Sequence, residues 1–195
     1  MNIIVMKFGG TSVASIEKLK NIVNIVSQEI KKNKVIVVLS AMAGETNKLQ
    51  SYLDEFGSNN SIESDLVLTS GEQVTIGLLS AALKNDGIKS IPLLGWQIPI
   101  ITDDNHEKAK ILQIDNKRIH KYLEKNDVIV LAGFQGINLH GNITSFGRGG
   151  SDTTAVAIAS AIDAERCDIF TDVDGVYTTD PNIDQKAKKI SKLSY

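Results

Sequence analysis

The sequence has little of what marks several classes of protein. Its single cysteine, Cys167, cannot form a disulfide within the chain, which excludes a disulfide-rich scaffold and favours a reducing compartment. Lys and Arg number 21 against 23 Asp and Glu, so the chain lacks the basic surface typical of sequence-independent nucleic-acid binding. No uninterrupted apolar run approaches the roughly 20 residues of a membrane span, and the first residues do not resemble a signal peptide. We therefore expect a globular cytoplasmic protein with neither a nucleic-acid nor a membrane partner.

Several catalytic motifs are absent as well. There is no GxxxxGK[ST] P-loop and no GxGxxG after a predicted strand, which excludes the two most familiar phosphate-binding loops. The sequence has no HExxH, no Cys/His cluster and no GxSxG elbow, so neither a zinc protease nor an α/β-hydrolase is indicated. The three histidines, His106, His120 and His140, are scattered, and we interpret each as a surface or structural residue.

The 195 residues that are present alternate between short β-branched runs and longer helical patterns. Buried strands are predicted at residues 3–5, 35–39, 90–94, 128–132 and 168–171, and helices at 16–30, about 72–83 and about 153–164. This alternation predicts an α/β fold, a three-layer sandwich with a mostly parallel central sheet. Residues 97–102 and 134–146 are expected to add β-hairpins, and residues 58–64 to form a surface loop.

Glycines gather at three junctions that follow predicted strands, at residues 7–12 (KFGGTS), 40–44 (SAMAG) and 147–152 (GRGGSD). In open α/β sheets, ligands bind beyond the carboxyl ends of the strands. Glycine lets the backbone approach a phosphate, and a following helix N-terminus offers free N–H groups. One Gly-Gly pair would be explained by a tight turn, but three junctions that also carry Lys, Arg and Asp predict an anion-binding site.

The charged residues at these junctions differ in how clearly they point to a ligand. Lys7 ends an apolar strand, where a lysine is costly unless it meets an anion, and Arg148 between glycines suits bidentate capture of a carboxylate or phosphate. Glu72 has two explanations, because residues 70–73 match a helix capping box. Asp152, at the start of a predicted helix, is equally open to a capping or a functional role.

Taken together, these strings resemble the bacterial aspartate kinases of the amino-acid-kinase superfamily. The matching segments, in family order, are KFGGTS (7–12), SAMAGETN (40–47), TSGEQVT (69–75), GFQG (133–136), FGRGGSDTTA (146–155) and TDVDGVYTTDP (171–181). The resemblance covers essentially the whole chain. It implies the amino-acid-kinase-like fold and phosphoryl transfer from ATP to the β-carboxylate of L-aspartate. The product would be 4-phospho-L-aspartate, on the way to lysine, threonine and methionine.

The resemblance also implies roles for individual residues. Lys7 and Asp152 would form the catalytic pair. ATP, bringing Mg²⁺ with it and needing no metal site of the protein, would contact Lys7, Phe8, Gly9, Gly10, Ser40, Thr171, Asp172, Asp174 and Tyr177. Aspartate would contact Thr46, Glu72, Arg148, Gly149 and Ser151. The chemistry agrees, since a zwitterion needs one cation and one anion. The acceptor carboxylate, with a pKa of about 3.9, is already ionised at pH 7 and needs no general base, so Asp152 is expected to orient the lysine or the metal.

The sequence departs from the family at two places. Asn182 stands where family members commonly carry arginine, and the chain stops where relatives continue into a further ATP-binding segment and paired ACT modules. We therefore expect residues 1–195 to form one catalytic domain that is truncated at its C-terminus, lacks the ACT modules and is a homo-oligomer when full length. Two alternatives stay open: a non-catalytic fragment that binds nucleotide or aspartate, and another superfamily kinase that acts on glutamate, acetylglutamate or a nucleotide.

Overall fold

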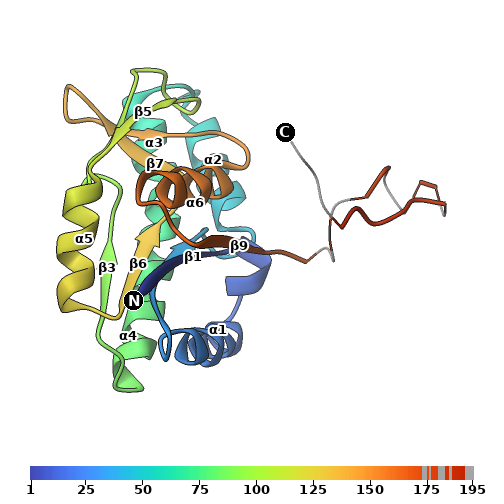
Figure 1. Ribbon diagram of the computed structural model, residues 1–195. Helices are drawn as coiled ribbons and strands as arrows, with labels where there is room; N and C mark the ends of the chain where they lie inside the picture. The colour runs from blue at the N-terminus through green and yellow to red at the C-terminus, as the bar shows by residue number, and fades with distance from the viewer. Residues whose placement is uncertain (173–174, 176, 180–182, 185, 192–195) are drawn as a thin grey trace.

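The computed structural model describes residues 1–172, 175, 177–179, 183–184 and 186–191 (Figure 1). Its main sheet contains all five predicted strands, in the order β3-β6-β2-β1-β9. They are β1 (Asn2–Phe8), β2 (Asn33–Leu39), β3 (Ser90–Leu93), β6 (Val128–Ala132) and β9 (Arg166–Phe170). Every neighbouring pair is parallel, so all five carboxyl ends lie along one edge.

Helices cover both faces of this sheet, which confirms the predicted three-layer sandwich (Figure 1). On one face, α1 (Ile16–Glu29) and α4 (Ser70–Asn85) pack on Met6 and its neighbours, and on the other, α5 (Asn116–Lys125) and α6 (Gly150–Ala161) pack around Val5. Successive strand residues point to opposite faces, so a strand covered on both sides must be apolar throughout. That is why continuous apolar runs, rather than alternating ones, mark these strands in the sequence.

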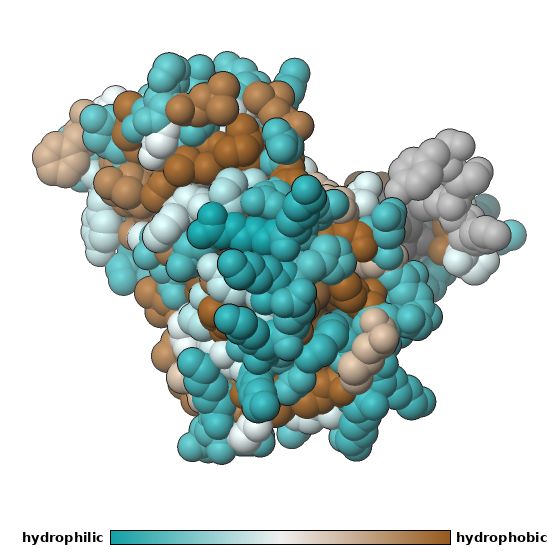
Figure 2. Space-filling model, turned by 60° about the vertical axis from the view of Figure 1, so that its left-hand side comes forward, coloured by the Kyte–Doolittle hydropathy of each residue, from teal (hydrophilic) through white to brown (hydrophobic). Residues whose placement is uncertain are grey.

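The helix α5 shows how one element divides between core and solvent. Its Ile119 and Leu123 are buried against the sheet, whereas Lys117 and Lys121 are exposed. Figure 2 shows the resulting hydrophilic face over this helix. The side chain of Asp115 caps the helix by accepting a hydrogen bond from the Arg118 N–H, so its first residue follows from a local sequence signal.

Two helices were not predicted, α2 (Glu45–Asp54) and α3 (Ile62–Leu68). The loop expected at residues 58–64 ends early, because Ser61 and Ser64 form a reciprocal capping box that starts α3. Together, α3 and α4 span Ile62–Asn85, which is long and apolar enough, by length and composition alone, to cross a membrane. Half of its most apolar window is buried inside the protein, so packing against the core accounts for its apolar character.

The capping box expected at residues 70–73 does not form. No side chain caps α4, because α3 leads into it through Thr69, whose N–H donates to the Asp65 carbonyl of the preceding turn. The backbone groups that a cap would serve already have helical partners. Glu72 is therefore free of any capping role.

A second sheet, in the order β5-β4-β7-β8, extends one end of the molecule. It consists of β4 (Ile100–Thr102), β5 (Ile111–Ile114), β7 (Gln135–Asn138) and β8 (Ile143–Ser145). The hairpin expected at residues 134–146 is present as β7–β8, but residues 97–102 do not form a hairpin of their own. Instead β4 pairs antiparallel with β5 and parallel with β7. In the β4–β5 loop, the Asp103 carboxylate accepts the backbone N–H of both Asn105 and Lys110, which holds the two ends of the loop together before the chain continues as β5.

Candidate active site

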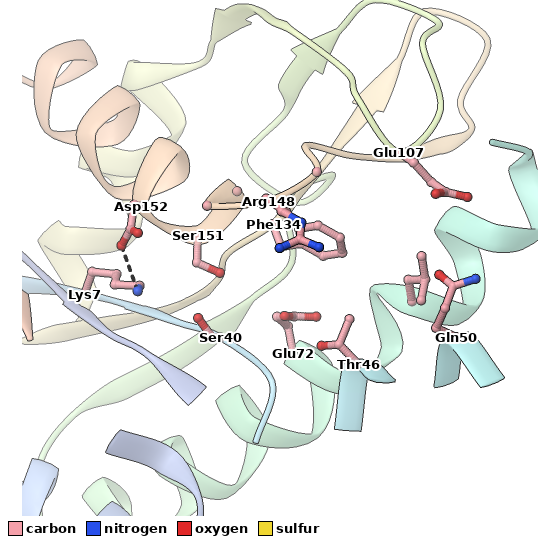
Figure 3. Close-up of a pocket in the computed structure, with 14 residues that line it drawn as sticks. Lys7, Ser40, Thr46, Gln50, Glu72, Glu107, Phe134, Arg148, Ser151 and Asp152 are labelled. Carbon is pink, nitrogen blue, oxygen red and sulfur yellow. Dashed lines mark ion pairs between the residues drawn. The ribbon is translucent and has the colours of Figure 1, made fainter. Parts of the chain in front are cut away.

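A cavity of about 520 Å³ opens at the carboxyl edge of the main sheet, where ligands are expected in such folds (Figure 3). Its lining comes from β1, the segments after β2 and β6, helices α2, α3 and α4, the β4–β5 loop, and the segment from β8 into the start of α6. The lining residues are Lys7, Ser40, Thr46, Gln50, Leu68, Glu72, Glu107, Phe134, Gly147, Arg148, Gly149, Gly150, Ser151 and Asp152. Segments that are far apart in the sequence thus form one site.

At one end of the cavity lies an ion pair between Lys7 and Asp152, with 2.7 Å between Nζ and Oδ1 (Figure 3). Lys7 shares the face of β1 that α6 covers, and Asp152 is in the first turn of that helix. The Lys7 side chain is 10% exposed and the Asp152 side chain 46%, so the ammonium is held inside while its partner reaches solvent. The α6 N-terminus has no side-chain cap and adds a positive dipole here.

In the middle of the cavity, Glu72 is a buried carboxylate with one unused oxygen. Its Oε1 accepts a hydrogen bond of 2.9 Å from the Ala41 N–H, and its Oε2 has no partner among the described residues. Burial raises the pKa of Glu72 to about 7, although the hydrogen bond from Ala41 opposes the rise. A buried polar atom without a partner is costly, so Oε2 is suited to receive a donor from a ligand.

Arg148 is the cation of the same region. It lies between Gly147 (φ 74°) and Gly149 (φ 72°), whose left-handed backbones turn the chain so that its side chain enters the cavity. Figure 3 shows the guanidinium end of Arg148 near the centre, on the side opposite Glu72. It makes no ion pair with any carboxylate in the described part of the chain. Among the described residues, the middle of the cavity therefore offers a cation without an ion pair, Arg148, opposite a buried carboxylate oxygen without a partner, Glu72 Oε2.

The five residues predicted to hold aspartate all line this cavity: Thr46, Glu72, Arg148, Gly149 and Ser151. A close approach of two segments positions the last of them. A Cβ at Gly133, after β6, would lie only 2.7 Å from Ser151 Oγ, so a residue without a side chain is needed there. The structure brings these residues together, and their contacts with a ligand remain a prediction.

The residues predicted to bind ATP are spread more widely. Lys7 and Ser40 line the main cavity. Phe8, Thr171 and Asp172 line a second hollow of about 330 Å³, where the Phe8 ring stacks on Phe170 with 4.4 Å between centroids. These two hollows flank the end of β1, so the predicted nucleotide residues divide between them.

Gly9 and Gly10 lie between the two hollows, where β1 passes into the short 3-10 helix η1 (Gly10–Val13). Tyr177 follows β9 and pairs with Lys189 in an isolated antiparallel bridge. Asp174, together with Asn182, lies outside the described residues.

Four cavity residues were not singled out from the sequence: Gln50, Leu68, Glu107 and Phe134. Phe134 is the one with a signal, since it belongs to the GFQG segment. It adopts a left-handed backbone with φ 67°, which is unusual for a bulky residue and typical of strain stored at a functional site. Leu68 and Gln50 come from the unpredicted helices, and Glu107 from the β4–β5 loop, so their places depend on tertiary structure.

The described residues contain no group of three or more His, Cys, Asp or Glu side chains that could hold a metal ion.

Comparisons with known proteins match this chain to amino acid kinases, and to aspartokinases among them. A model of the amino acid kinase family matches residues 2–195. Aspartokinase from Rickettsia conorii is 50% identical over an alignment of 200 residues that covers 100% of this chain and 50% of that protein. The structure of E. coli aspartokinase III in complex with aspartate and ADP has a TM-score of 0.80 at 27% identity, covering 96% of this chain and 53% of that one. Aspartate kinase from Synechocystis gives a TM-score of 0.79 at 39% identity, over 95% and 31% respectively. The chain thus spans about half the length of the curated relatives it matches.

Proposed function

The chain belongs to the amino acid kinase family, and we propose that its cavity binds L-aspartate and transfers the γ-phosphoryl group of ATP to the β-carboxylate, giving 4-phospho-L-aspartate. The observation that carries this proposal is the pair of unmatched charges in the middle of the cavity. An α-amino acid presents one ammonium and one α-carboxylate, and Glu72 and Arg148 offer one partner for each.

The acceptor end follows from these two contacts. Glu72 Oε2 would accept from the ammonium, and the Arg148 guanidinium would donate to the α-carboxylate. The side-chain carboxylate would then point toward Lys7, at the other end of the cavity. With a pKa of about 3.9, this carboxylate is ionised at pH 7 and attacks phosphorus without losing a proton.

At the phosphate end, the residues supply positive charge rather than proton transfer. The Lys7 ammonium and the α6 N-terminus would neutralise the charge of the transferring phosphoryl group. Asp152 holds Lys7 in place through their ion pair and is not required as a base. Mg²⁺ bound to the ATP phosphates would lower the charge between donor and acceptor, and Asp152, which lies beside Lys7, is a carboxylate that would help to hold it.

The comparisons support this choice of substrate. The curated relatives that match the whole chain at about half identity are aspartokinases, and E. coli aspartokinase III binds aspartate and ADP. Because the reaction consumes free aspartate and ATP, we place the protein in the cytoplasm. The scatter of the predicted nucleotide residues favours a second candidate, a chain that binds aspartate without transferring phosphate.

A hydroxylamine-trapping assay tests both candidates. We expect the chain with ATP, Mg²⁺ and aspartate to form aspartyl hydroxamate, and to form none from N-acetylglutamate, which lacks the ammonium that Glu72 Oε2 requires. Aspartate binding by calorimetry without hydroxamate would favour the second candidate. Equal turnover of N-acetylglutamate and aspartate, or no binding of aspartate, would refute the proposed acceptor.

A further inference from the structure

Asp65 is a completely buried carboxylate that lies outside the cavity and has no part in the chemistry proposed above. It sits on α3 and accepts three hydrogen bonds. The Ser145 hydroxyl and the Glu107 backbone N–H (3.0 Å) donate to its Oδ1, and His106 Nδ1 lies 2.7 Å from its Oδ2. Burying a carboxylate is costly unless such partners are held firmly, so this cluster fixes the segments that supply them.

Each of those segments continues into the wall of the cavity. Ser145 ends β8 and is followed closely by Gly147 and Arg148. His106 and Glu107 belong to the β4–β5 loop, and the Glu107 side chain lines the cavity end farthest from Lys7 (Figure 3). One buried carboxylate therefore joins the helix, the loop and the strand that surround the acceptor end.

The loop and the Arg148 segment are also in direct contact. The Ala109 N–H donates to the Ser145 carbonyl over 2.9 Å. A Cβ at Gly147 would lie 2.9 Å from the Glu107 carbonyl oxygen, so the loop backbone touches the residue before Arg148. Glu107 itself has a left-handed backbone with φ 60°, a conformation that persists only where neighbouring contacts impose it. A shift of this loop must therefore shift the chain that carries Arg148.

We propose that Asp65 and His106 form a positioning pair for the acceptor end of the cavity, a role that rests on the proposed function. Neither side chain touches a substrate. They act through Arg148 and Glu107, by fixing the segments that carry these two residues into the cavity wall. Residues that orient a binding group in this way commonly change affinity or activity by 10- to 100-fold when they are lost, as around metal sites.

The test is a set of matched histidine variants. His106→Leu removes the donor to Asp65, whereas His106→Asn places an amide N–H near the position of Nδ1. His120→Leu, at an exposed position of α5, is the control. By calorimetry on the full chain, we expect His106→Leu to weaken aspartate binding about tenfold and ATP binding less than twofold. His106→Asn should recover most of the aspartate affinity.

Three other outcomes would refute the proposed positioning role of Asp65 and His106. These are equal losses for both ligands, no loss of aspartate affinity, or His106→Asn behaving like His106→Leu. If His106→Leu does not fold, Ser145→Ala is used instead, because it removes one of the two donors to Asp65 Oδ1. It too should weaken aspartate binding more than ATP binding.

A second readout separates this proposal from the proposed function. Hydrogen exchange without ligand should be faster at residues 103–110 and 146–149 in His106→Leu than in His120→Leu, with β1 and β2 unchanged. If the wild-type chain binds no aspartate, the acceptor assignment fails while exchange still reports on the pair. Unchanged exchange in both segments would refute the positioning role itself.

Discussion

Replacing Glu72 by glutamine should strengthen the fold and weaken the site at the same time. Glutamine keeps the shape and an oxygen that can accept the hydrogen bond from the Ala41 N–H. It also replaces the unpartnered Oε2 by an amide nitrogen and removes the charge. The two consequences have opposite signs, so one variant tests both the burial of Glu72 and its role.

The stability effect follows from the pKa of Glu72, which burial raises from 4.5 to about 7. Between these values the folded protein keeps a proton that the unfolded chain has lost. The free energy of unfolding therefore falls as the pH rises through this window, and the full cost is present above about pH 7. A shift of this size corresponds to about 3 kcal/mol at 1.36 kcal/mol per unit. Glu72→Gln avoids that cost, so it should be more stable than wild type by up to about 3 kcal/mol at pH 8 and nearly equal at pH 5.

The binding effect follows from the lost charge. Truncating one partner of a buried charge pair costs about 2–5 kcal/mol, so the aspartate KM should rise about a hundredfold with little change in the ATP KM. In the wild type, aspartate binding should strengthen as the pH rises from 6 to 8, because only ionised Glu72 can pair with the ammonium.

Urea unfolding at pH 5 and pH 8 measures the free energy of unfolding of both proteins, and aspartate and ATP titrations of the same samples measure their ligand binding. Glu124→Gln, at an exposed position of α5, is the control and should change neither property. The reasoning is refuted if Glu72→Gln gains equal stability at both pH values, gains none at pH 8, or binds aspartate as well as the wild type.

Three further substitutions test other parts of the site. Arg148→Lys should raise the aspartate KM at least tenfold and the ATP KM far less, because the bidentate geometry is lost; equal effects in steady-state kinetics would contradict that assignment. Asp152→Asn should lower kcat by loosening Lys7 without removing a basic limb from the pH–rate profile, whereas loss of such a limb would identify Asp152 as a base. Gly133→Ala places a Cβ 2.7 Å from Ser151 Oγ and 3.0 Å from the Leu39 carbonyl oxygen. It should destabilise the fold by about 1–3 kcal/mol in urea unfolding, and an unchanged midpoint would show that α6 can shift.

The main sheet was predictable because its strands are buried on both faces and so appear as unbroken apolar runs. Helices such as α1 were predictable because one face is apolar at regular spacing. The seven residues of α3 are too few for such a pattern, and their start depends on a Ser61–Ser64 box of an uncommon type. The strand β5 escaped prediction because it is short and only partly buried.

The site was predictable only where glycine junctions mark it. Lys7 and Arg148 carry their signal in the residues beside them. Glu72 did not, because the local pattern at residues 70–73 suits a capping box, and only the continuation of α3 into α4 excludes it. Asp65 and Glu107 have no motif, and they meet because α3 and the β4–β5 loop pack together.

The place of β1 in the sheet affects the order in which the protein can fold during synthesis. Lys7 lies on β1, which precedes both of its neighbours in the chain, and it pairs with Val38 of β2 on one side and Ile169 of β9 on the other. Its second neighbour thus emerges from the ribosome more than 150 residues later. Pairing over such a separation carries a large loop-closure cost and is typically late in folding. The nascent chain therefore completes the pairing of the strand that bears Lys7 only after the other cavity-lining residues have been made, so the Lys7 end of the site is completed late in folding.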